Sequence, residues 1–218
     1  MRLIDVSHTI EAGMITYKGL PAPLMCDFLS RENSRALYAD GHEFQIGRLE
    51  MVGNTGTYLD SPFHRYASGK DLSELQLSQL AHLDAIVVRA PHERSITVDV
   101  DAFAGLVVGG KAVLVHTGWA GYWRTDKYFE NHSYLTEAAA NFLVQAGATL
   151  VGIDSYNIDD TRTRSRPVHT VLLGAEIPIC EHMCNLGSLP DDGFHFYAVP
   201  PKLKHFGTFP VRAFARVG

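Results

Sequence analysis

A short series of apolar runs around one clear helix pattern constrains the fold of this chain more than any other feature. Residues 85–89 and 112–116 are short continuous apolar runs, which are typical of strands buried on both faces. Residues 136–147 begin with a Thr that can cap a helix, continue with several alanines and close on a Gly; residues 150–154 form the next buried run. This order of strand, helix and strand predicts an α/β fold, with a mixed β core flanked by helices.

The other segments carry weaker patterns. The first forty-five residues are punctuated by Gly and Pro and are expected to be irregular. Alternating apolar and polar residues predict a strand over 44–52, with a bulge at Gly47. Leucines at helical spacing predict one or two short helices over 71–80. We expect further strands over 194–199 and 211–215.

The composition favours one compact unit that does not bind nucleic acid. The chain has 218 residues and is 46% hydrophobic, so a single domain over 1–218 can bury a large core. Its formal net charge is -5, without a basic patch of the kind that nucleic acids need. The N-terminus lacks the apolar core of a signal peptide, and no run of ~18 apolar residues occurs. A cytoplasmic protein without membrane contact is therefore expected.

The cysteines predict neither a disulfide framework nor a metal site. Cys26, Cys180 and Cys184 are three in number, so they cannot all pair within one chain. Cys180 lies in an apolar run and is expected to be a buried thiol, and no second pair completes a Cys-x3-Cys metal site. Reduced thiols are the simplest interpretation.

The first candidate for chemistry is the turn-rich segment 56–64. It holds Asp60 and His64 four positions apart, with Pro62 stiffening the chain between them. On a loop the two side chains could face one pocket. The alternative is a turn with an incidental Asp and a surface His.

A second candidate lies near the end of the chain. Glu181 follows an apolar run that starts at Val171, and a carboxylate at the end of an apolar strand is costly unless it is paired or binds a metal. Together with Asp60 and His169 it would offer one nitrogen and two carboxylate ligands. That set suits zinc or manganese and leaves a position open for water. The alternative is an ion pair between Glu181 and an arginine of the segment 162–166.

The segment 54–64 resembles the signature of the cyclase family of metal-dependent hydrolases, which includes kynurenine formamidases and isatin hydrolases. That signature is His-x-Gly-Thr-His-x-Asp-x-Pro-x-His, and five of its seven defined positions match, at Gly56, Thr57, Asp60, Pro62 and His64. Similarity extends over nearly the whole chain and includes 5–10, 117–119, 151–154, the pair of His169 and Glu181, and 210–213. The resemblance implies a swivelling β/β/α-like fold.

The resemblance also implies roles for individual residues. Asp60, His169 and Glu181 are expected to hold one divalent metal, zinc or manganese, and His64 is expected to transfer protons. Tyr17, in a stretch that resembles the family's substrate pocket, is expected to contact the substrate.

Two positions depart from the family. Asn54 and Tyr58 stand where the family has two histidines that hold a first metal, and an amide or a neutral phenol is a weak ligand. Two outcomes follow. One metal persists on the other ligands, or Asn54 and Tyr58 form hydrogen bonds with Asp60 and the site binds metal weakly or not at all.

The resemblance favours a hydrolase of an amide, cyclic amide or ester bond in a small, aromatic molecule, similar to an arylformamidase. The rival hypothesis is a small-molecule binding protein, or a catalytically altered relative, that has lost the dimetal chemistry. Relatives are dimers or tetramers, so a homodimer or homotetramer is expected. The aromatic pairs Tyr122-Trp123 and Tyr128-Phe129 are candidate interface anchors, with packing into the chain's own core as the alternative.

Overall fold

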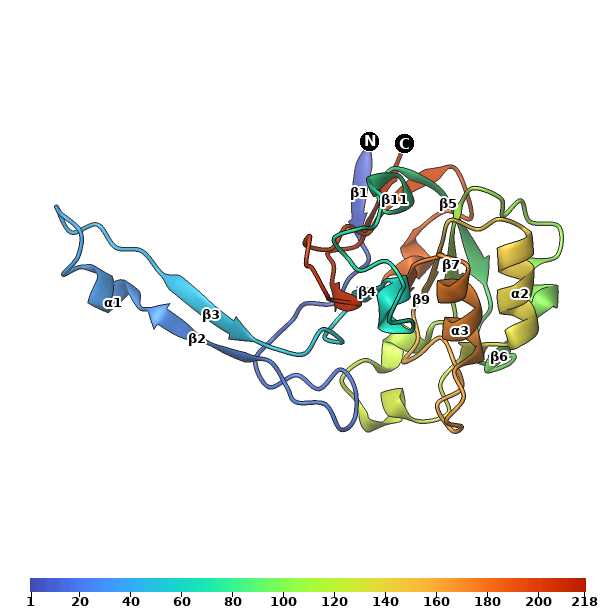
Figure 1. Cartoon of the computed structure of the whole chain (residues 1–218), viewed down its shortest axis with the longest axis horizontal. Coiled ribbons are helices and arrows are strands. Elements are labelled where there is room, and N and C mark those ends of the chain that lie inside the picture. The colour runs from blue at the N-terminus through green and yellow to red at the C-terminus, as the bar shows by residue number, and fades with distance from the viewer.

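The computed structural model describes all 218 residues and centres on one nine-stranded mixed sheet (Figure 1). The strand order is β1-β13-β11-β5-β7-β9-β10-β4-β12. The four strands β5, β7, β9 and β10 pair in parallel, and the strands on both sides of them are antiparallel. This confirms the predicted α/β fold with a mixed β core. The strands are β1 (Arg2–Asp5), β4 (Tyr58–Asp60), β5 (Leu83–Arg89), β7 (Ala112–His116), β9 (Leu150–Ile153), β10 (Ile179–Glu181), β11 (Phe194–Tyr197), β12 (Thr208–Pro210) and β13 (Phe214–Val217).

Two helices lie next to each other on one face of the parallel strands, α2 (Glu137–Gln145) and α3 (Pro167–Gly174) (Figure 1). As predicted, Thr136 caps α2: its hydroxyl accepts a hydrogen bond from the Ala139 N–H at 3.0 Å. Gly147, with φ 77°, supplies the left-handed residue that ends the helical segment. The helices bury a core between themselves and this face, and the other face carries a second core of similar size.

Two expectations about secondary structure are wrong, one about a helix and one about a strand. Residues 71–80 form turns and one 3-10 turn, Leu77–Gln79, in place of α-helices. The apolar run that starts at Val171 is not one strand, because its first part belongs to α3 and the strand β10 begins only at Ile179. Glu176, with φ 60°, and Pro178 lie between the two elements and prevent either from continuing. The remaining elements are short: strands β6 (Thr97–Val98) and β8 (Tyr134–Leu135), and 3-10 turns at Pro62–His64, Val100–Phe103, Trp119–Tyr122, Asp126–Phe129 and Leu186–Ser188.

A long hairpin projects from the body of the molecule (Figure 1). Its strands β2 (Leu24–Leu29) and β3 (Ile46–Glu50) form a sheet of their own, and the short helix α1 (Arg31–Ser34) follows β2. We call residues 24–50 the arm. The expectation of an irregular start to the chain is therefore wrong for β1, β2 and α1, although residues 6–23 form no helix or strand. The strand expected over 44–52 exists as β3, but it is exposed on both faces, and the register shift lies opposite it, between Asp27 and Leu29.

The predicted interface aromatics pack within the chain. Tyr128 is 1% exposed and forms a cluster with Trp119 and Tyr156. Tyr122, Trp123 and Phe129 are half-buried against the same cluster. The alternative, that these rings belong to the chain's own core, therefore describes them correctly.

The cysteines are unpaired, and Cys180 is buried as predicted, whereas Cys26 is exposed. None of the helices has the length and apolar character that crossing a bilayer requires.

Candidate metal centre and its pocket

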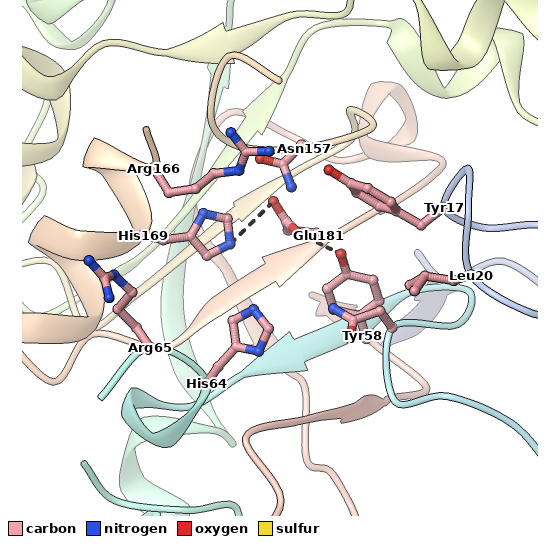
Figure 2. A pocket seen from close by; sticks show the side chains of 10 residues that line it. Tyr17, Leu20, Tyr58, His64, Arg65, Asn157, Arg166, His169 and Glu181 are labelled. Carbon is pink, nitrogen blue, oxygen red and sulfur yellow. Dashed lines mark hydrogen bonds and ion pairs between the residues drawn. The ribbon is translucent and has the colours of Figure 1, made fainter. Parts of the chain in front are cut away.

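A cavity of about 260 Å³ opens where β4, β10 and α3 meet (Figure 2). It contains six residues that the sequence singled out, namely Tyr17, Asn54, Tyr58, His64, His169 and Glu181, together with Leu20, Arg65, Asn157 and Arg166. Asp60 is fully buried beside them, with one carboxylate oxygen within 3.6 Å of His169. The structure thus brings together two segments that lie more than a hundred positions apart.

Three potential ligand atoms converge at the end of the cavity. Asp60 and Glu181 lie on the neighbouring strands β4 and β10, and His169 enters from α3. His169 Nε2 is 3.6 Å from Asp60 Oδ2 and 3.8 Å from Glu181 Oε1. Two ligands at about 2.1 Å from a tetrahedral ion lie roughly 3.4 Å apart, so this spacing suits a shared cation. Asp60 Oδ2 is buried without a hydrogen-bond partner, which is costly unless a cation meets it.

Asp159 orients the imidazole of His169. One of its oxygens lies 2.6 Å from His169 Nδ1, and the carboxylate also accepts hydrogen bonds from the backbone N–H groups of Val168 and His169 at the start of α3. With Nδ1–H held in this way, Nε2 is the nitrogen that faces Asp60 and Glu181 and that a bound metal would use. A carboxylate behind a histidine ligand is the usual support of a metal site. Sequence reasoning missed Asp159; its only signal was an acid shortly before a helix that begins with Pro.

Thr208 sets the tautomer of His64. Its hydroxyl donates to Asp60 Oδ1, a carboxylate that can only accept, so its oxygen accepts the hydrogen bond from His64 Nδ1–H at 2.8 Å. His64 Nε2 is then free to accept a proton. The close approach of the two segments requires Gly207, because a Cβ there would lie 2.5 Å from the backbone of His64.

The charges of the centre are strongly coupled. Burial alone would lower the pKa of His169, but the charge of Glu181 and the contacts with Asp159 and Asp60 raise it to about 10. Burial and the nearby charge of Asp60 raise the pKa of Glu181 to about 7. Three carboxylates therefore surround one imidazole, and a divalent cation would offset that negative charge. The donor set fits such an ion.

His64 belongs to an overlapping group of possible ligands. Asp60, His64 and His169 each place one ligand atom within 4.8 Å of the other two. The two sets share Asp60 and His169. Only the set with His64 has all three ligand atoms within 4.8 Å of one another, whereas Glu181 approaches His169 Nε2 at 3.8 Å. His64 is also more exposed than the other three, which suits a group that exchanges protons with substrate and solvent.

Tyr58 forms a hydrogen bond with Glu181, where the sequence suggested one with Asp60. Its hydroxyl lies 2.7 Å from Glu181 Oε2 and 3.2 Å from His182 Nε2, and His182 Nδ1 lies 2.9 Å from the hydroxyl of Tyr128. Because the carboxylate accepts, the only consistent direction is that Tyr128 donates to His182, His182 to Tyr58, and Tyr58 to Glu181. Burial lowers the pKa of His182 to about 3, so the chain of bonds is neutral. Sequence reasoning missed Tyr128 and His182 as parts of the site.

No arginine pairs with Glu181, so the ion-pair alternative is wrong. Arg162 bonds to Asp160 instead, and Arg166 donates to backbone carbonyls. The backbone N–H of Ile158 donates to Glu181 Oε1 at 2.6 Å, which fixes the carboxylate from the side opposite Tyr58.

Comparisons with known proteins identify a family and similar folds. The profile of a family described as "Putative cyclase" matches residues 4–160. A kynurenine formamidase of Geobacillus thermodenitrificans is 28% identical over 98% of this chain and 96% of its own, and one of Bacillus anthracis is 25% identical over the same shares. An isatin hydrolase A from Labrenzia aggregata superposes with a TM-score of 0.84 at 19% identity, covering 99% of this chain and 93% of its own. A potential metal-dependent hydrolase with cyclase activity superposes with a TM-score of 0.80 at 24% identity, covering 98% and 96%.

Proposed function

The chain belongs to the cyclase family, and on that premise we propose that it is a hydrolase, dependent on one divalent metal, that cleaves an amide or cyclic amide bond in a small aromatic molecule. The observation that carries the proposal is that His169 Nε2 lies 3.6 Å from Asp60 Oδ2, a buried oxygen without a hydrogen-bond partner, and 3.8 Å from Glu181 Oε1. Its named relatives hydrolyse C–N bonds, as kynurenine formamidases and isatin hydrolases.

Each residue of the centre has a distinct task. Asp60, His169 and Glu181 would hold the ion, zinc or manganese, and Asp159 keeps His169 in the tautomer that can do so. A bound divalent ion supplies a Lewis acid that activates water and polarises a carbonyl. His64 takes the proton of the attacking water at Nε2 and returns it to the leaving nitrogen, while Thr208 holds its Nδ1–H.

The chain of bonds from Tyr128 through His182 to Tyr58 supports a single ion. The phenol hydrogen of Tyr58 occupies one lone pair of Glu181 Oε2, and Ile158 N–H occupies one lone pair of Oε1, the oxygen that lies 3.8 Å from His169 Nε2. A second cation at the positions of Asn54 and Tyr58 would meet an amide and a neutral phenol, which are poor ligands. At the positions of Asn54 and Tyr58 we therefore propose a neutral chain of hydrogen bonds in place of a second cation.

Aromatic residues next to the centre support an aryl substrate. Tyr17 lines the cavity and stacks on Tyr156 with 4.6 Å between ring centroids, so it offers a flat, fixed surface. Leu20 and Tyr58 extend that surface. Formylated aryl amines and isatins are the compounds to test first.

The arm supports the proposal that the protein is a homo-oligomer, a dimer or a tetramer. It holds half of the exposed large apolar side chains of the chain: Leu24, Met25, Phe28, Leu37, Tyr38, Phe44, Ile46 and Leu49. An isolated two-stranded hairpin is marginally stable in water. From Leu24 to Glu50 the arm has roughly 27 residues, and a standard interface uses about 20–30 residues on each side. A second copy of the chain is the one partner that is always present. Separately, we propose that the protein is cytoplasmic.

A substrate panel tests the function. We expect protein loaded with zinc or manganese to hydrolyse at least one compound among formylated aryl amines, isatins and small lactones, with loss of activity on chelation. Release of formate or of the opened ring would be followed. If no compound of the panel reacts while the metal is bound, the rival hypothesis of a small-molecule binding protein is the better one.

A further inference from the structure

The two walls of the cavity differ in chemistry (Figure 2). Tyr17 and Leu20 lie on one side, and Arg65 and Arg166 lie on the opposite side, with His169 and Glu181 between them. The aromatic side accounts for a ring in the substrate. The arginine side has no part in the chemistry described so far.

Neither arginine has a carboxylate within ion-pairing distance, in contrast to Arg162, which bonds to Asp160 through both Nε and Nη2. Arg166 uses only Nη1 within the protein, for the backbone carbonyls of the loop 160–165. Arg65 uses only Nε, for the hydroxyl of Thr170 at 3.1 Å. Nη2 and Nε of Arg166 and both terminal nitrogens of Arg65 are left without a protein acceptor.

Asn157 adds a third donor to this wall. Its side-chain oxygen accepts a hydrogen bond from the backbone N–H of Asp159 at 2.9 Å, which fixes the orientation of the amide. No protein group accepts from its NH2, and the residue lines the same cavity while being only 5% exposed. The wall thus consists of donors that lack acceptors.

The charge of the pocket points in the same direction. With the proposed divalent ion bound, its two charges and those of the two guanidinium groups would exceed the three negative charges of Asp60, Asp159 and Glu181 by one. A cleft with an excess positive charge attracts anions and holds them against its donors. Guanidinium groups suit carboxylates in particular, because their paired N–H groups match the two oxygens.

We propose that Arg65, Arg166 and Asn157 form a subsite for a carboxylate on the substrate, so that the enzyme acts on aromatic amides that carry a negative charge. This inference rests on the proposed function for the reaction and for the ion in the charge balance, but the binding of the carboxylate requires no hydrolysis. The ring lies along Tyr17, the bond to be cleaved lies at His64 and the metal ligands, and the anionic group lies against the arginines.

Binding of two matched probes tests the subsite without any hydrolysis. The probes are 2-aminobenzoate and 2-aminobenzamide, which share ring and amine and differ in charge, and their fluorescence is followed on titration with the metal-loaded protein. We expect the anion to bind at least about tenfold more tightly. Arg65→Ala and Arg166→Gln should each reduce that preference several-fold; the Gln variant keeps an N–H donor for the loop carbonyls.

Arg164 provides the matched control. It lies in the neighbouring hollow with Arg65 and Arg166 but does not line the cavity of the metal centre, so Arg164→Gln should keep the full preference. Equal affinity of the wild type for both probes, or no binding of either, would overturn the proposal. A preference that survives in both variants would overturn it too, because the carboxylate would then be held by the metal. Failure to hydrolyse any formylated amine, with the preference intact, would instead count against the proposed function alone.

Discussion

The metal centre and the arm differ in what holds their side chains in place. Tyr58, Asp60 and Glu181 are at most 1% exposed, and each is fixed by hydrogen bonds from groups elsewhere in the chain. Every residue of β3, and all but the last of β2, is exposed, and the side-chain bonds there run only within the arm. The side chains of the centre are fixed by the chain itself, whereas the arm leaves most of its large apolar side chains exposed. Mutations in the two regions should therefore change different properties.

The largest effect is expected at Asp60. Asp60→Ala removes a ligand and leaves Glu181 and Asp159 around His169, so we expect both metal and activity to be lost. Elemental analysis and the substrate panel check the two properties together. Retention of a full complement of metal in this variant would show that the ligand set is wrong.

The next effect is expected at His64. His64→Ala removes a proton-transfer step that is normally worth ~10²–10⁴-fold in rate. Because the proposed ligand set contains Glu181 and not His64, metal content should stay nearly unchanged. Loss of the metal together with activity would instead support the overlapping set of Asp60, His64 and His169.

A mutation in the arm should change the oligomeric state of the protein and leave its catalytic activity unchanged. Phe28 is 76% exposed, and Phe28→Glu should weaken the dimer by about 30-fold or more, which is the effect of losing an interface hot spot. Sedimentation velocity over a range of concentrations measures this. Val107→Glu, at a similarly exposed apolar residue of the body, is the control and should leave assembly unchanged. A monomeric wild type would refute the role of the arm.

The smallest effect compares two helix caps. The hydroxyl of Thr136 caps α2 in the body, and that of Ser30 caps α1 in the arm. Thr136→Ala should reduce the free energy of unfolding by about 1 kcal/mol, because α2 packs on the core. Ser30→Ala should change it far less, since α1 packs on no core. Equal losses in chemical denaturation would mean that the arm and the body unfold as one unit.

The same contrast explains what the sequence could predict. The strands at 85–89, 112–116 and 150–154 and the helix α2 were predictable, because apolar runs and caps are local signals. The arm was not, because an alternating strand looks alike whether its apolar face meets the chain's own core or another molecule. The helix α3 was missed because its apolar residues and those of β10 form one apolar run that is interrupted by a single charged residue, Glu176.

In the site, residue patterns and a family resemblance identified the candidate residues, but neither identified the side chains that hold them in place. Asp159, Thr208 and His182 act by fixing other side chains, and nothing in their own neighbourhood in the sequence shows which side chain they will meet. The bond of Tyr58 to Glu181 in place of Asp60 follows from the antiparallel register of β4 and β10, which sets Tyr58 opposite Glu181. Such pairings are decided only when the sheet is assembled.

The metal content of the purified protein tests the central claim most directly. The account predicts one divalent ion per chain after saturation with zinc or manganese and removal of the excess, because the bonds from Tyr128 through His182 to Tyr58 occupy one lone pair of Glu181 Oε2 and the neutral phenol is a poor ligand. Elemental analysis with an accurate protein concentration gives the ratio. Two tightly held ions per chain, or an ion held by Asn54 and Tyr58 in a metal-bound structure, would contradict it.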